Sequence, residues 1–326
     1  MALPILLVAF NRPQLTLKLL EQVEILDKRK IFISVDGVNT KINHQVKRYY
    51  ETQSNIEEWM SKTKHDVKFR SMNENLGCNQ HTVSAMKWFT SFHESGLLVE
   101  DDLEFQTSFL KFLDSIKIDE IHGMYDSICS TNSNWTRDIL HKPPSGKVEF
   151  FESVIFSQTW GMTFSKASTD RLISFQQRMF REKIQIRKVI RKWSRQASGN
   201  FLLRLQLEKY WLGKFDRVLA TWDKSRNGYD KSQEVGWDAV YQLAAIYFER
   251  RFLLPNWNVG RTSLDANEGA WHEWIAPYER WETVHLNLEY LLDVKNIQYF
   301  PKELKSLRFS KRNFPFKSIL GRNISY

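Results

Sequence analysis

The alternation of short apolar runs with longer amphipathic segments in the first hundred residues is the strongest constraint on the fold of this chain. The apolar runs have the length and composition of strands and cover residues 4–10, 31–35, 67–72 and 96–100. The segments between them have helical periodicity, at about 13–25, 42–63 and 81–93. This alternation predicts an α/β fold with a mostly parallel sheet flanked by helices.

The later part of the chain is less regular. A helix and two short strands are expected, at 107–116, 125–130 and 251–255. Between them, residues 131–147 are expected to form a loop and residues 150–164 a buried aromatic segment. Residues 166–220 are expected to be basic and mainly helical. No internal repeat or low-complexity linker separates them, so we expect one catalytic-type domain with a helical insertion.

Polar residues follow each of the four predicted strands. They are Asn11 and Arg12, Asp36 and Gly37, the run Asn75–Gly77, and the acids Glu100, Asp101 and Asp102. Because ligands of parallel α/β sheets bind at the carboxyl ends of the strands, these four clusters predict one ligand site.

The acid triplet raises a question of charge. Three consecutive carboxylates next to a buried strand are costly unless a positive group neutralises them. A hard cation such as Mn²⁺ or Mg²⁺, sharing its ligands with substrate phosphates, would do so. The alternative at this point is an ordinary solvated loop.

The composition is that of a globular protein. The chain has 326 residues and a mass of 38.8 kDa, which suits one large domain with an appended lobe or two modest domains. No apolar stretch approaches the roughly 20 residues of a membrane span, and the short apolar start is interpreted as a first strand. Only two cysteines occur, so a reducing compartment is a simpler interpretation than a disulfide scaffold. They lack zinc-type spacing, so no structural zinc site is expected.

The net charge of +9 is concentrated in two stretches, residues 178–195 and the tail from Lys302. Such stretches attract nucleic acid, an anionic membrane surface or a phosphorylated substrate. A solvated helix face is an equally good interpretation.

The sequences LLVEDDLEF (97–105) and PILLVAFNRP (4–13) resemble nucleotide-sugar glycosyltransferases of the GT-A fold. The similarity is greatest to the branch of N-acetylglucosaminyltransferase I and its bacterial relatives. It covers residues 4–110 in good order and continues more loosely to about 275. It implies a Rossmann-like GT-A fold and the EDD version of the DxD motif.

The resemblance also implies roles for individual residues. Asp102 matches the acid that binds the metal of the nucleotide diphosphate. Asp36 matches the aspartate that faces the uracil ring, and Glu100 and Asp101 match acids that face the ribose and sugar. Donor contacts are further implied for Asn11, Arg12, Asn75, Gly77 and His81.

Inverting transfer needs a carboxylate that takes the proton of the acceptor hydroxyl. Two Trp-Asp pairs supply candidates, Asp223 and Asp238. Asp238 fits better the order of the relatives, in which the pair opens a helix followed by a strand, a proline and a loop. We therefore predict Asp238 as the general base, with Asp223 second. The competing interpretation is that Asp238 only caps its helix.

Two further residues are implied by the resemblance. His272 is in the position of a late-loop histidine that completes the metal shell, although its neighbours differ from the relatives' pattern. Trp160 resembles the tryptophan of a turn beside the donor sugar, where an aromatic ring packs against a sugar face. Trp160 as a core residue is the alternative.

The leading prediction is therefore a metal-dependent, inverting glycosyltransferase using a UDP-sugar. Its acceptor would be a hydroxyl of a glycan or lipid-linked acceptor in surface polysaccharide, lipopolysaccharide or glycoprotein synthesis. The alternatives are a nucleotidyltransferase acting on sugar phosphates, which the absence of a Gly-rich, Lys-containing first loop disfavours, and a nucleic-acid-binding or anionic-surface-binding protein that uses 178–195. An inactive carbohydrate-binding relative is also consistent with the motifs.

The predicted division of the chain follows from this hypothesis. A nucleotide-sugar-binding part (1–165) precedes a basic helical insertion (166–220), an acceptor and catalytic part (221–295) and a basic extension (296–326). The charge and composition suggest a bacterial cytoplasmic enzyme in peripheral contact with the inner membrane face, with no nucleic-acid partner.

Overall fold

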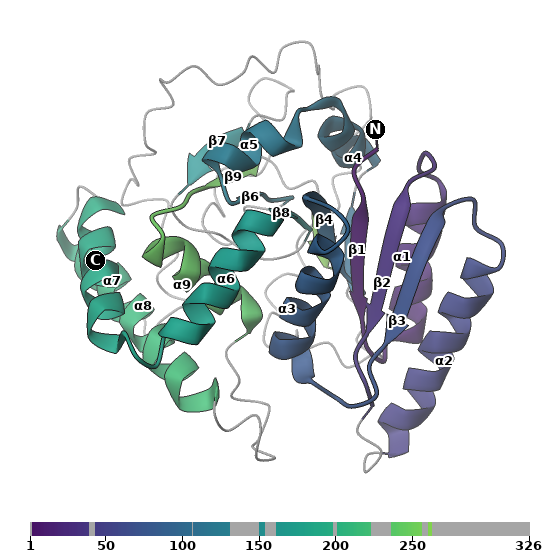
Figure 1. Ribbon diagram of the computed structural model, residues 1–326, viewed down its shortest axis with the longest axis horizontal. Helices are drawn as coiled ribbons and strands as arrows, with labels where there is room; N and C mark the ends of the chain where they lie inside the picture. The colour runs from purple at the N-terminus through teal and green to yellow at the C-terminus, as the bar shows by residue number, and fades with distance from the viewer. Residues whose placement is uncertain are drawn as a thin grey trace, which may run out of the picture.

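A five-stranded sheet forms the centre of the protein in the computed structural model (Figure 1). The structure describes residues 2–38, 43–105, 107–130, 150–153, 161–197, 201–222, 236–255 and 260–262. The strands are β1 (Ile5–Ala9), β2 (Lys30–Val35), β3 (Asp66–Ser71), β4 (Ser95–Glu100) and β8 (Met162–Ser165), in the order β3-β2-β1-β4-β8. The first four are parallel, and β8 is antiparallel to β4. The predicted mostly parallel α/β sheet is confirmed.

Helices cover both faces of the sheet because its buried strands alternate their side chains between the two sides. Ile5 and Leu7 of β1 pack in one apolar cluster with α1 (Pro13–Glu24), α2 (Asn43–Met60) and α4 (Thr107–Ser115). Leu6 and Val8 pack in a second cluster with α3 (Gly77–Thr90), α6 (Lys166–Arg178) and α9 (Trp237–Tyr247). The result is a three-layer arrangement (Figure 1).

Two small sheets extend the main one. β5 (Leu103–Phe105) follows β4 after a two-residue turn and pairs antiparallel with β10 (Gly260–Thr262). β9 (Phe252–Pro255) lies between β6 (Ser127–Ile128) and β7 (Phe150–Ser153). A short helix, α5 (Ile118–Met124), precedes β6. β5, α5 and β10 were not expected from the sequence, since elements this short have little periodicity.

The predicted helical insertion consists of α6, α7 (Lys183–Ala197) and α8 (Phe201–Trp222). Ile186, Ile190 and Trp193 of α7 are buried in the cluster that also holds the sheet residue Phe164. These helices therefore share the core of the α/β part. The predicted domain boundaries stay predictions, and 296–326 lies outside the described residues.

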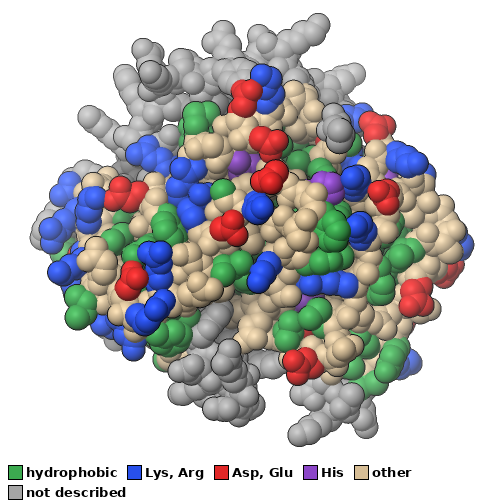
Figure 2. Space-filling view, viewed as in Figure 1, with side chains coloured by type: hydrophobic (Ala, Val, Ile, Leu, Met, Phe, Trp, Pro, Cys, Tyr) green, Lys and Arg blue, Asp and Glu red, His purple; other side chains and the backbone are tan. Residues whose placement is uncertain are grey.

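The basic face of α7 is partly neutralised by acids of α8 and of the turn after α9. Arg187 pairs with Asp216 at 2.6 Å and Arg191 with Glu208 at 3.3 Å, and Lys192 pairs with Glu249. Lys and Arg side chains are frequent over this part of the surface (Figure 2). The ion pairs favour the interpretation of 178–195 as a solvated helix face.

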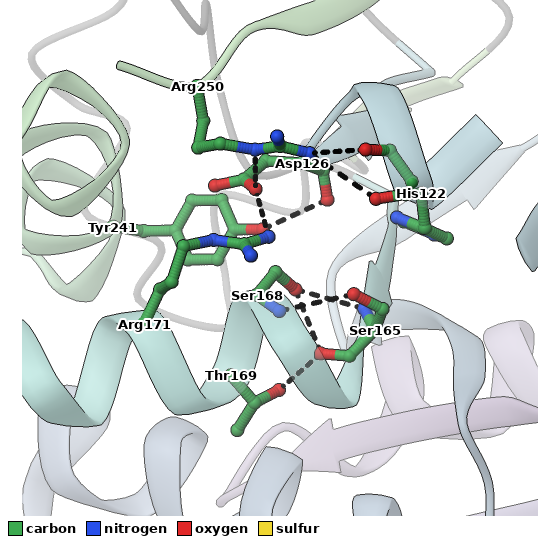
Figure 3. A network of polar contacts seen from close by, with 9 residues as sticks. His122, Asp126, Ser165, Ser168, Thr169, Arg171, Tyr241 and Arg250 are labelled. Atoms are coloured by element: carbon green, nitrogen blue, oxygen red, sulfur yellow. Dashed lines mark hydrogen bonds and ion pairs between the residues drawn. The ribbon is translucent and has the colours of Figure 1, made fainter. Parts of the chain in front are cut away.

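A buried polar network ties the helical part to β6 (Figure 3). Asp126, directly before β6, accepts hydrogen bonds from Arg171 of α6 and from Arg250 Nε, the latter at 3.2 Å. Tyr241 of α9 donates its hydroxyl to the Asp126 carbonyl at 3.2 Å. Three segments are thereby held at one point. Among the described residues, no helix has the length and apolar content to cross a membrane.

Candidate functional site

The acid triplet lies at the carboxyl edge of the sheet and meets Arg12 from the neighbouring strand end. Arg12 Nη1 donates to Asp101 Oδ1 at 3.0 Å and to Asp102 Oδ2 at 2.7 Å. The Phe10 backbone N–H donates to the other Asp101 oxygen at 3.1 Å. Both aspartates are only 5% exposed, so the solvated-loop interpretation is wrong. Arg12 binds two of the three acids, so one guanidinium offsets part of the charge of the triplet.

Glu100 at the end of β4 contacts the second Trp-Asp pair. The indole Nε1 of Trp237, the first residue of α9, donates to Glu100 Oε1 at 3.0 Å. This hydrogen bond joins residues 137 positions apart in the chain. Asp238 follows in the same turn, and its charge contributes to the raised pKa of Glu100. The two motifs that the sequence suggested separately therefore lie next to each other.

Asp238 does not cap α9, because the N-cap residue is Gly236. The carboxylate lies in the first helical turn, where the helix dipole favours negative charge. Its side chain is half-buried and makes no hydrogen bond or ion pair with the described part of the chain.

Burial dominates the electrostatics of the site. Burial raises the pKa of Glu100 to about 8, with a further contribution from the Asp102 charge and an opposing one from the Trp237 hydrogen bond. Burial also raises the pKa of Asp101 to about 6, against the attraction of Arg12. Burial opposes the charge of Arg12, but the carboxylates outweigh it and raise its pKa. Arg12 is therefore the fixed cation of the site.

The second and third strand ends also meet, but they bind each other. Asp36 accepts backbone N–H groups of Leu76 at 2.8 Å and Gly77 at 2.9 Å. Asn75 Nδ2 donates to the Gly37 carbonyl at 2.7 Å. Gly77 has φ +75°, a conformation that favours glycine, at the start of α3. Asp36 thus holds the loop before α3, and its predicted contact with a base stays a prediction.

His81 of α3 is buried against β2. Its Nε2 is 2.8 Å from Ser34 Oγ, and the residue is 2% exposed. Burial, followed by the charge of Arg70, lowers its pKa to about 3, so the ring is neutral. These are the properties of a core histidine, and they give no support to the donor contact predicted for it.

A metal at this site would depend on Asp102. Within the described residues, no group of three or more His, Cys, Asp or Glu side chains is arranged to hold a metal ion. Mg²⁺ is commonly bound by one or two carboxylates together with substrate phosphates. The carboxyl edge of the sheet can provide the carboxylates. The oxygen donors therefore fit a hard cation that arrives with a nucleotide. Three of the predicted site residues lie outside the described residues: His272, Asp223 and Trp160. The predicted donor residue Asn11 is half-buried and precedes Arg12 in the chain.

Two residues of the site were not predicted from the sequence. Trp237 is conspicuous only as half of a Trp-Asp pair, and nothing local indicates that its N–H reaches Glu100. Cys78 is reachable by solvent, yet protein surrounds its sulfur on most sides. This desolvation, followed by the charges of Glu100 and Asp238, raises the pKa of the Cys78 thiol well above its usual value.

Comparisons with known proteins add little. No family model matches the chain, and no curated protein matches it. Among solved structures, HddC from Yersinia pseudotuberculosis aligns with 51% of this chain and 78% of its own, at 11% identity and a TM-score of 0.30. A 4-diphosphocytidyl-2C-methyl-D-erythritol synthase from Anaerococcus prevotii aligns with 52% and 76%, again at 11% identity and 0.30. Neither is named as a glycosyltransferase, and likenesses this low carry no argument about function.

Proposed function

We propose that the chain is a metal-dependent transferase that binds a nucleoside-diphosphate sugar at the carboxyl edge of the sheet. The finer proposal is an inverting glycosyltransferase that uses a UDP-sugar and a hydroxyl acceptor on a glycan or lipid-linked glycan. The observation that carries it is the contact between Trp237 and Glu100, at 3.0 Å, because it brings Asp238 to the acid triplet.

In this proposal each residue has a separate task. Asp102 holds Mn²⁺ or Mg²⁺, which supplies Lewis-acid stabilisation of the departing diphosphate when bound. Arg12 holds Asp101 and Asp102 in place through its two hydrogen bonds, and its charge favours the ionised form of Asp101. Asp238 removes the proton of the acceptor hydroxyl, since its carboxylate is half-buried in the first turn of α9.

Donor binding is tested by thermal unfolding with UDP-, GDP-, CMP- and ADP-linked sugars, each with Mn²⁺ or EDTA. A ligand at a hundred times its dissociation constant stabilises the fold by about 2.7 kcal/mol. We expect one nucleotide to raise the melting temperature only with metal, and Asp102→Asn to remove the effect. Asp170→Asn, which changes an exposed carboxylate of α6, is the matched control. If no nucleotide stabilises the protein, the proposal is wrong.

Asp238→Asn separates binding from chemistry. The variant should keep the metal-dependent stabilisation and lose sugar transfer by about a hundredfold or more, as expected for loss of a general base. Transfer at the wild-type rate would remove Asp238 from the mechanism.

A nucleotidyltransferase acting on sugar phosphates is the second candidate. The observation that favours it is the half-buried ammonium of Lys214 near Asp238, because the acceptor in that reaction is a phosphate. The released product distinguishes the two. Nucleotidyl transfer releases pyrophosphate from a nucleoside triphosphate, whereas glycosyl transfer releases a nucleoside diphosphate from a nucleotide sugar.

A further inference from the structure

One side of α8 carries a stripe of residues that the proposed chemistry does not use. Tyr210, Lys214 and Arg217 are spaced by four and three residues and therefore lie on the same face of the helix. The Lys214 ammonium lies 5.6 Å from the centre of the Tyr210 ring. Tyr210 and Lys214 are half-buried, and Arg217 is exposed.

This stripe lies near the predicted base. Burial lowers the pKa of Lys214, the Asp238 carboxylate opposes that shift, and the Arg217 charge adds to it. Asp238 likewise contributes, after burial, to the raised pKa of Tyr210. α8 packs against α9, which carries Asp238. A ligand hydroxyl next to Asp238 would therefore have this stripe beside it.

The two sides of α8 differ in their charge balance. Asp216 and Glu208 bind cations of α7. Lys214, in contrast, makes no hydrogen bond or ion pair with any residue in the described ranges, and its contact is the Tyr210 ring. The charge of Asp238 acts on Lys214 without a hydrogen bond or ion pair between them, so part of the cost of half-burying this cation remains. A ligand anion at this position would offset that cost.

We propose that Tyr210, Lys214 and Arg217 form an acceptor subsite that binds a phosphate group of the acceptor. The proposal rests on the proposed function, because it places the acceptor beside Asp238. Lys and Arg provide the donors for phosphate oxygens, and the tyrosine ring offers an apolar face to a sugar. The phosphate has two sources, a soluble sugar phosphate or the phosphate of a lipid-linked acceptor.

The test measures binding of glucose 1-phosphate by calorimetry and of vesicles containing phosphatidic acid by sedimentation. We expect one probe to bind, and Lys214→Gln to weaken its binding about tenfold, the loss of one charge-assisted contact. Lys214→Arg should restore most of the binding. Lys188→Gln, which removes an exposed charge from α7, is the matched control and should leave binding unchanged. The probe that binds identifies the source of the phosphate.

The subsite is refuted if neither probe binds, or if Lys188→Gln weakens binding as much as Lys214→Gln. Donor-nucleotide stabilisation measured on the same variants keeps the two proposals apart. If nucleotide binding depends on Asp102 but phosphate binding does not depend on Lys214, only the subsite proposal fails. If phosphate binds through Lys214 and no nucleotide binds, the phosphate site stands, but the transferase proposal fails and with it the acceptor role of the site.

Discussion

The contact between Glu100 and Trp237 shows how a single hydrogen bond positions the candidate site. The carboxyl group is buried, and its pKa is raised to about 8 by burial and then by the charge of Asp102. The indole N–H is the donor that offsets part of this cost. Since Trp237 precedes Asp238 on α9, the same bond sets the position of the predicted base.

Trp237→Phe should therefore lower the free energy of unfolding by more than ring size explains. It leaves a buried acceptor without its donor, which costs about 1–3 kcal/mol, and donor or acceptor binding should weaken with it. Trp211→Phe is the control, because Trp211 is also buried but its N–H has no hydrogen-bond partner in the described structure. Urea unfolding measures both variants. Equal losses would show that the Glu100 contact has no energetic role.

His81 predicts a pH dependence of stability. Its pKa is lowered to about 3 in the folded protein by burial and then by Arg70, whereas an unfolded histidine titrates near pH 6.5. The unfolded state therefore binds more protons below that pH, and stability falls as the pH falls. Between pH 7 and pH 5, His81 should account for about 2 kcal/mol of the fall in the free energy of unfolding. The free energy of unfolding of His81→Gln should therefore fall by about 2 kcal/mol less than that of the wild type over this range. Parallel unfolding curves for the two proteins would contradict the buried neutral ring.

At the scale of elements, α9 is held by polar contacts at its first turn and one turn further along the helix. Its first turn contacts β4 through Trp237, and Tyr241 contacts the residue before β6 (Figure 3). Asp126 accepts hydrogen bonds from Arg171 of α6 and from Arg250, which lies between α9 and β9. The helix that carries the predicted base is thus held by polar contacts as well as by its apolar face.

Asp126→Asn tests this attachment. Removing one partner of a buried ion pair typically costs about 3–5 kcal/mol, and here two arginines lose their carboxylate. Asp216→Asn breaks the exposed pair with Arg187 and should cost about 1 kcal/mol or less. Chemical denaturation of both variants measures the difference. Similar small losses would mean that apolar packing alone holds the helices.

At the scale of the whole molecule, the chain has one thiol at the site and one in the core. Cys78 lies near Glu100 and Asp238, while Cys129 is fully buried between the sheet and the helices. Burial raises the pKa of Cys129 to about 12. The two thiols therefore report on different parts of the folded protein.

Thiol alkylation should modify Cys78 alone in the folded protein, slowly at neutral pH because its pKa is raised. Under denaturing conditions both thiols should react. A saturating nucleotide sugar with Mn²⁺ should slow the Cys78 reaction about tenfold or more, because the rate falls with the fraction of protein that has no ligand bound. Mass spectrometry of the modified peptides measures each rate. Equal rates with and without every nucleotide would place the ligand elsewhere.

The sequence by itself determined the α/β architecture and the edge at which polar residues gather. Both follow from local properties, because the strands from Ile5 to Glu100 are short apolar runs and the helices between them have amphipathic periodicity. Parallel strands must end at a common edge, which is why Arg12 and Asp102 could be expected near each other. The acid triplet was informative because charge next to an apolar strand needs compensation.

Only the tertiary structure decided which partner each polar side chain finds. Arg12 compensates Asp101 across 89 residues, and Trp237 reaches Glu100 across 137, through packing that no local pattern encodes. Asp36 turns to the loop before α3, and the structure places His81 in the core although the sequence suggested a donor contact. The physical reason is that side-chain orientation and burial depend on the neighbouring layers, and long-range packing fixes those layers.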